Sequence, residues 1–167
     1  ADYFLIVALS WIVFSVVGMV PYLCLADMDV ASAFFETMSG FTTTGATCIN
    51  NIESLPKSLL FWRALTQWIG GLGIVVFSFA LIPVYEMKNS NIYSAEVTGL
   101  GLDKLRPKIG STARRVLLSY LVLTGACAFL YWMGPMNLYD AVCHAFSTIA
   151  TGGFSTHSQS IAYFRSN

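Results

Sequence analysis

Long uncharged apolar runs alternate with two short amphipathic stretches along the chain. Residues 3–26 carry no charge and would measure about 36 Å as a helix, which exceeds the roughly 30 Å of a bilayer core. Residues 58–85 form a second apolar run, interrupted only by Arg63 and Gln67 near its start, and residues 116–133 form a third. The pattern predicts three membrane-spanning helices.

Two further stretches are too short to cross a membrane. Residues 30–41 would span only about 18 Å as a helix, and residues 137–150 form a similar short helix. Each runs into a loop rich in Thr and Gly, the first reading Phe41-Thr-Thr-Thr-Gly-Ala-Thr47 and the second Thr148-Ile-Ala-Thr-Gly-Gly-Phe154. Irregular backbone is tolerated at membrane depth only where protein buries it or where it lines a wet cavity. We therefore expect two re-entrant half-helices whose loops line an ion path.

The order of span, half-helix and Thr/Gly loop occurs twice. A shift of 107 residues places Thr44-Gly45 on Thr151-Gly152, although direct identity between the two copies is low. Span, pore helix and span form the unit of potassium-channel pores, and one pore needs about four such loops around an axis. We predict an all-α integral membrane protein with about one and a half to two of these four repeats. The predicted division is a first repeat at 1–88, a cytoplasmic linker at 89–111, and a second repeat at 112–167 that lacks its closing span.

Composition supports a membrane protein. Hydrophobic residues make up 56% of the chain and charged residues 11%, with a mean hydropathy of +0.64, whereas a soluble domain carries about 25% charge. The zero net charge gives no basic footprint for nucleic acid. The four cysteines form no metal-type pair, and a bond between Cys24 and Cys48 stays open. No nucleophile–base set or metal cluster stands out, so no enzyme activity is expected.

The basic residues indicate the orientation. Most of the nine Lys and Arg residues fall within residues 86–115, and short loops rich in Lys and Arg stay in the cytoplasm. Both Thr/Gly loops then open to the outside. The outer segments are mainly acidic, which would attract cations.

Backbone carbonyls in the two loops are the candidate ion ligands, because such carbonyls can replace the water around a potassium ion. Gly45 and Gly152 are expected to be decisive, since Gly adopts the positive φ that turns successive carbonyls one way. The half-helices end at the loops, and their negative dipole ends would favour a cation between them. The candidate ligands are Thr42, Thr43, Thr44, Gly45, Ile149, Ala150, Thr151 and Gly152.

Ionisable residues near the apolar layer are costly and usually paired. We expect Arg63 either to pair with Glu36 or to cap carbonyls behind the first loop, with Gly153 as a further supporting position. The alternative is that Arg63 extends to the membrane interface. Gly70, Gly71 and Gly73 indicate close helix packing, with a hinge as the other interpretation.

Three segments resemble the Trk/Ktr/HKT superfamily of potassium transporters, and within it the bacterial TrkH type of potassium-translocating subunit. They are FFETMSGFTTTGAT at 34–47, WRALTQWIGGLG at 62–73 and FSTIATGGFST at 146–156. The resemblance implies potassium uptake across the bacterial inner membrane, with K⁺ as the transported ion and no organic cofactor.

The same resemblance implies four repeats in one chain, a homodimer, and a cytoplasmic nucleotide-binding gating subunit of the TrkA type as partner. It also implies that Gly in the filter goes with potassium selectivity. Two alternatives stay open: a sodium-coupled Ktr-type subunit, and a membrane-embedded enzyme or scaffold with re-entrant helices. The loops carry almost no acid–base or metal-binding side chains, which argues against the second.

Overall fold

The computed structural model describes residues 2–90 and 106–164, and within them it is all-helical. Two helical segments, Leu5–Leu25 and Arg114–Met133, are long and apolar enough to cross a membrane. The elements are α1 (Asp2–Gly18), α2 (Val20–Leu25), α3 (Val30–Phe41), η1 (Ile52–Ser54), α4 (Lys57–Ser90), α5 (Arg106–Met133), α6 (Leu138–Ile149) and η3 (Ser160–Tyr163). The predicted all-α membrane class is confirmed.

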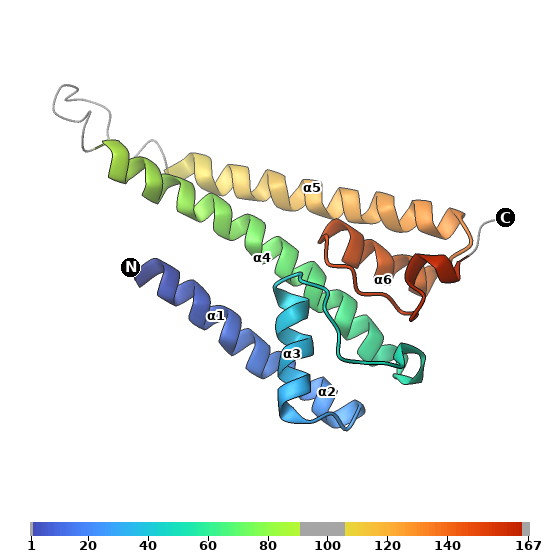
Figure 1. The fold of residues 1–167 in the computed structure, drawn as a ribbon. Coiled ribbons are helices and arrows are strands. Elements are labelled where there is room, and N and C mark those ends of the chain that lie inside the picture. The colour runs from blue at the N-terminus through green and yellow to red at the C-terminus, as the bar shows by residue number, and fades with distance from the viewer. Residues whose placement is uncertain (1, 91–105, 165–167) are drawn as a thin grey trace.

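Helix α4 lies at the centre of the arrangement (Figure 1). The short helix α3 packs against α1 and α4, and the short helix α6 packs against α4 and α5. One long helix therefore contacts both half-helices.

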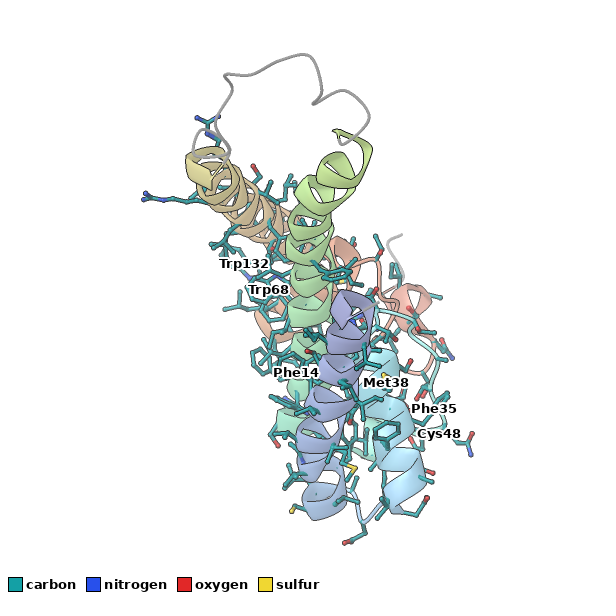
Figure 2. All side chains as sticks on the ribbon, turned by 90° about the vertical axis from the view of Figure 1, so that its left-hand side faces the viewer. Phe14, Phe35, Met38, Cys48, Trp68 and Trp132 are labelled. Carbon is teal, nitrogen blue, oxygen red and sulfur yellow. The ribbon has the colours of Figure 1, made fainter. Side chains whose placement is uncertain are left out.

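Figure 2 shows the packing of α1 and α3 from the side. Some of their side chains lie between the two helices, and others project outward. The Phe14 ring lies 6.1 Å from the Phe41 ring, and the Ser15 hydroxyl lies 3.5 Å from the sulfur of Met38. Trp132 on α5 is 54% exposed. Large exposed apolar side chains along α1 and α5 are what lipid or further membrane helices would cover.

The first predicted span is not one uninterrupted helix. Helix α1 ends at Gly18 and α2 begins at Val20, with Pro21 in its first turn. Proline has no N–H to donate within a helix, and the Tyr22 N–H bonds to Met19 O rather than to Gly18 O. The indole N–H of Trp62 donates to the Gly18 carbonyl at 3.0 Å, so α4 satisfies a group that the break leaves free.

Helix α3 has the predicted extent, whereas α6 begins one residue after and ends one residue before the predicted range 137–150. Each half-helix starts directly after a capping side chain. Asp29 accepts a hydrogen bond from the Ser32 N–H at 3.1 Å before α3. Asn137 accepts one from the Asp140 N–H at 2.9 Å before α6. Such caps satisfy N–H groups that a helix start leaves without partners.

The division into repeats stays a prediction. Helix α4 continues to Ser90, and α5 begins at Arg106 inside the predicted linker. The rest of that linker, residues 91–105, lies outside the described residues.

Candidate ion-binding site

The two Thr/Gly loops leave their half-helices with the same backbone turn. Thr43 and Thr151 both have φ of 55°. The Thr44 N–H donates to Ser39 O at 3.0 Å, and the Gly152 N–H donates to Ser147 O at 2.8 Å. Two short helices of low sequence identity thus end in one local geometry.

This geometry corrects the alignment of the two repeats. Thr43 and Thr151 are equivalent, as are the caps Asp29 and Asn137, and both pairs are 108 residues apart rather than 107. The predicted alignment matched the two Thr-Gly pairs, but the equivalent of Thr44 is Gly152. With the structural alignment, the counterpart of residues 42–45 is residues 150–153.

Two of the predicted site residues change role as a result. Positive φ is found at Gly45 (74°) and at Gly153 (91°), but not at Gly152. The prediction that Gly152 is needed for its positive φ is therefore wrong. Ile149 is the last residue of α6, so it corresponds to Phe41 rather than to a loop position.

The two loops touch one another. A Cβ placed on Gly45 would lie 1.8 Å from the carbonyl oxygen of Gly152, which no side chain can tolerate. The sequence places these residues in separate repeats, and the structure brings them into direct backbone contact.

In both loops most backbone N–H groups have hydrogen-bond partners in the protein, whereas the carbonyls have none among the described residues. The N–H groups of Thr42, Thr43 and Thr44 bond back to α3, as those of Ala150, Thr151 and Gly152 bond back to α6. Within the described part of the chain, no donor bonds to the carbonyls of residues 42–45 or 150–153. These two loops offer a set of free oxygen ligands.

Glu36 supports the segment after the first loop. Its side chain is fully buried and accepts hydrogen bonds from the Thr47 hydroxyl at 2.5 Å and from the Cys48 N–H at 2.6 Å. Arg63 Nη2 lies 3.4 Å from Glu36 Oε2. The expected Glu36–Arg63 pair is present, and it joins α3 to α4.

Arg63 contacts the second repeat as well. Its Nη1 donates to Ser155 O at 3.3 Å, and its Cζ lies 4.2 Å from the centre of the Phe154 ring. The side chain is 1% exposed, which excludes the alternative of extension to the interface. Arg63 therefore caps a carbonyl behind the second loop rather than the first.

His144 supports the segment after the second loop. Its Nδ1 lies 2.8 Å from Asp140 O, and its Nε2 lies 2.9 Å from the Ser155 hydroxyl. Since a carbonyl can only accept, Nδ1 carries a proton, and in the neutral imidazole Nε2 then accepts from the Ser155 hydroxyl. His144 is a hydrogen-bonded structural residue.

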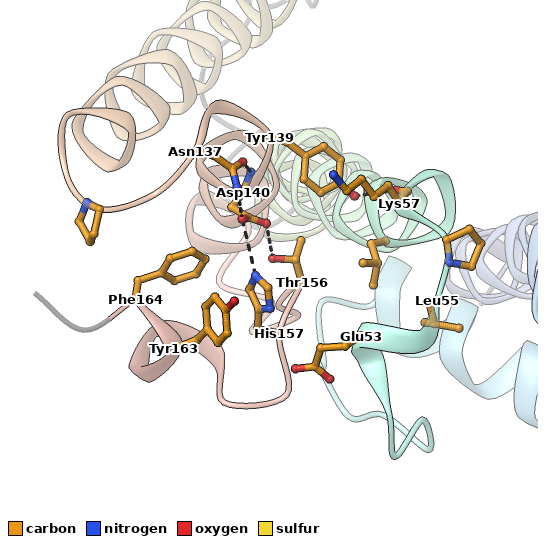
Figure 3. A pocket seen from close by; sticks show the side chains of 13 residues that line it. Glu53, Leu55, Lys57, Asn137, Tyr139, Asp140, Thr156, His157, Tyr163 and Phe164 are labelled. Atoms are coloured by element: carbon orange, nitrogen blue, oxygen red, sulfur yellow. Dashed lines mark hydrogen bonds and ion pairs between the residues drawn. The ribbon is translucent and has the colours of Figure 1, made fainter.

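The start of α6 is tied to the chain beyond the second loop (Figure 3). Asp140 accepts a hydrogen bond from the Thr156 hydroxyl at 2.6 Å and lies 3.6 Å from His157 Nε2. These residues line a cavity of about 850 Å³ that also contacts Glu53 and Lys57. The carboxylates of Asp140 and Glu53 accept hydrogen bonds from Thr156 and Ser158, and Lys57 Nζ lies 5.7 Å from the centre of the Tyr139 ring. The cavity lies beside the loops.

The glycines of α4 allow close packing. A Cβ on Gly70 would lie 2.0 Å from Phe41 O, and a Cβ on Gly71 would lie 3.0 Å from the Ala150 Cα. Helix α4 runs unbroken through them. The packing interpretation is confirmed, and α4 touches the ends of both half-helices.

The sequence leaves open whether Cys24 and Cys48 form a disulfide bond. In the structure both are free thiols. Partial burial, and secondarily the Glu36 carboxylate, raise the pKa of the Cys48 thiol.

Comparison with known proteins shows the family. The sequence matches the family model described as "TrkH: Cation transport protein" over residues 1–167.

The chain belongs to the TrkH family.

Relatives of known name lie in the same family. The chain is 45% identical over 166 residues to the Trk system potassium uptake protein TrkH of Escherichia coli K12, and 40% identical over 166 residues to TrkG of the same strain. These matches cover 98% of this chain and 34% of each relative. The crystal structure of the potassium transporter TrkH from Vibrio parahaemolyticus superposes with a TM-score of 0.81 at 44% identity, covering 99% of this chain and 32% of that chain.

The chain therefore spans about a third of the length of these TrkH-family relatives. It is a membrane protein of a cation-transport family.

Sequence reasoning missed one buried residue beside the TrkH-type loops. Gln67 is fully buried, and its Oε1 accepts a hydrogen bond from the Phe154 N–H at 3.1 Å. A polar residue one turn after Arg63 in an otherwise apolar helix was the available signal, because such residues in membrane helices mark functional contacts.

Proposed function

We propose that this chain forms part of a potassium pore in a Trk-type uptake subunit, with ion ligands supplied by backbone carbonyls. The observation that carries the proposal is the pair of loops whose N–H groups bond back to α3 and α6 while the carbonyls of residues 42–45 and 150–153 have no donor within the described residues. Free carbonyls on irregular backbone are the ligands used by potassium filters.

The half-helices favour a cation at the same place. Helices α3 and α6 both end at the loops, and each helix C-terminus carries about half a negative charge. Two such ends beside free carbonyls would stabilise a dehydrated K⁺ without a charged ligand that would hold it too tightly to leave.

The proposal includes the surroundings of the pore. We place the protein in the bacterial inner membrane, with both loops open to the outside and residues 86–115 in the cytoplasm, because that segment holds most of the basic residues. The pore would be completed by two further repeats, the subunit would form a homodimer, and a nucleotide-binding gating subunit of the TrkA type would dock from the cytoplasm.

Complementation tests the proposal. The full-length parent protein is expressed in a strain deficient in potassium uptake, and growth on low potassium is measured for the unaltered chain and for Gly45→Ser. We expect the unaltered chain to restore growth and Gly45→Ser to lose it, because a side chain at 45 meets the Gly152 carbonyl.

Gly125→Ser is the matched control. A Cβ on Gly125 meets nothing within 4 Å, so this change should leave growth intact. Growth that is indifferent to Gly45→Ser would contradict a filter role for the first loop.

A further inference from the structure

Gln67 belongs to α4, the closing helix of the first predicted repeat, yet its contacts are with the second loop. Its Oε1 accepts from the Phe154 N–H at 3.1 Å. A Cβ on Gly152 would lie 2.3 Å from Gln67 Cδ, 2.4 Å from Oε1 and 2.6 Å from Nε2. The amide group of Gln67 therefore lies flat against the Cα of Gly152.

The Gln67 amide accounts for the need for Gly at 152. Backbone conformation does not require it, since Gly152 lacks the positive φ of Gly45 and Gly153. The three atoms nearest to a Cβ at 152 all belong to the Gln67 side chain. The space that a residue with a side chain would need at 152 is filled from the other repeat.

The orientation of the Gln67 amide follows from its partner. A backbone N–H can only donate, so the oxygen of Gln67 faces Phe154. The Nε2 group has no hydrogen-bond partner within the described part of the chain, although the side chain is fully buried. Leaving both N–H donors of a buried amide without partners is costly, which indicates that the position of Gln67 serves the loop rather than its own hydrogen bonding.

We infer that Gln67 is a positioning residue for the second pore loop, and that ion selectivity at residues 150–153 depends on this side chain of the first repeat. The selectivity part rests on the proposed potassium pore; the contact between Gln67 and Gly152 does not. Arg63, one turn earlier, holds Ser155 O, so α4 fixes the backbone of the second loop at two successive places.

Suppression of one substitution by another tests the inference in the full-length protein. Gly152→Ala should reduce Rb⁺ uptake about tenfold. The double variant with Gln67→Ala should take up Rb⁺ about three times faster than Gly152→Ala alone, as expected for two residues in direct contact. The second change removes the very atoms that the new Cβ meets.

Gly45→Ala is the matched comparison. Its clash is with the Gly152 carbonyl and its φ is 74°, so Gln67→Ala should not restore uptake in that background. Restoration of both glycine variants, or of neither, would overturn the inference.

Selectivity separates positioning from simple packing. Gln67→Met keeps the bulk of the side chain but loses the acceptor for the Phe154 N–H, and we expect its Rb⁺ over Na⁺ preference to fall about threefold or more at unchanged protein abundance. An unchanged preference would reduce Gln67 to a packing residue and overturn the positioning role.

Melting temperatures of the purified protein test the contact between Gln67 and Gly152 without a measurement of ion transport. The unaltered chain, both single variants at 67 and 152 and the double variant are compared, and the double variant should melt above Gly152→Ala. If the unaltered chain carries no Rb⁺, the proposed function fails while these temperatures still decide the contact. Strictly additive temperatures would overturn it.

Discussion

Glu36 and His144 occupy equivalent positions on the two half-helices, 108 residues apart, and each holds the segment that follows its own loop. Glu36 accepts from the Thr47 hydroxyl, and His144 Nε2 accepts from the Ser155 hydroxyl at the equivalent position. The carboxylate needs Arg63 as its counter-charge, whereas a neutral imidazole needs none. The segment after each loop is thus held at the same position by a hydroxyl hydrogen bond, to a carboxylate in the first repeat and to an imidazole in the second.

Removal of the Arg63 charge should destabilise the protein strongly. In Arg63→Gln, the fully buried Glu36 loses its counter-charge, and breaking a buried pair by removing one partner costs about 3–5 kcal/mol. The melting temperature of the purified full-length protein should fall, and adding Glu36→Gln should recover part of the loss. Arg114→Gln, at an exposed arginine, is the control, and an equal effect there would refute the role of the pair.

His144 and Ser155 should behave as one unit. His144→Phe and Ser155→Ala each break the 2.9 Å hydrogen bond between them, so the second change should add little once the first is made. We expect a coupling of about 1 kcal/mol in a double-mutant cycle measured by thermal or denaturant unfolding. Additive losses would show that the bond contributes nothing.

Two loop glycines should differ sharply in tolerance. Gly153 has φ of 91° with open space around its Cα, whereas Gly45 has φ of 74° and the Gly152 carbonyl against it. Gly153→Ala should cost about 1–2 kcal/mol of conformational strain, and Gly45→Ala should also break the loop contact and abolish Rb⁺ uptake. Gly153→Asn should be milder still, since Asn adopts positive φ more readily. Equal loss of uptake in the two Ala variants would contradict the contact.

The Glu53–Ser158 contact should depend on pH. Hydrogen bonds from the Ser158 hydroxyl and N–H, at 2.5 and 2.8 Å, lower the pKa of the Glu53 carboxyl below its ordinary value. The contact therefore stabilises fully above the ordinary pKa of glutamate and is lost as pH falls through the lowered pKa.

Limited proteolysis of the segment after the second loop, from pH 7 to pH 4, measures this. Cleavage near residue 158 should increase at the acid end of the range, and in Ser158→Ala the increase should begin at a higher pH. A profile of cleavage that Glu53→Gln leaves unchanged would show that another group is responsible.

The half-helices were predictable because their signals are local. Asp29 and Asn137 are capping residues placed directly before short apolar stretches, and a stretch of that length cannot cross a bilayer. Arg63 and Glu36 were predictable as a pair because isolated charges in an apolar layer require partners.

Other features depend on contacts that the linear sequence does not display. The one-residue error in alignment arose because Thr44-Gly45 and Thr151-Gly152 look alike, while equivalence is decided by hydrogen bonds to Ser39 and Ser147. Gln67 has its partner, Phe154, 87 positions away, and no periodicity reports such a distance. The break at Met19 was missed because the apolar run itself is continuous across Pro21.

Helix α4 couples the two loops mechanically. Its side chains at 63 and 67 reach the second loop, although α4 follows the first loop in the chain. A shift or rotation of α4 would therefore displace the backbone at Phe154 and Ser155 at once, because the side chains that anchor these two residues lie on one helix face.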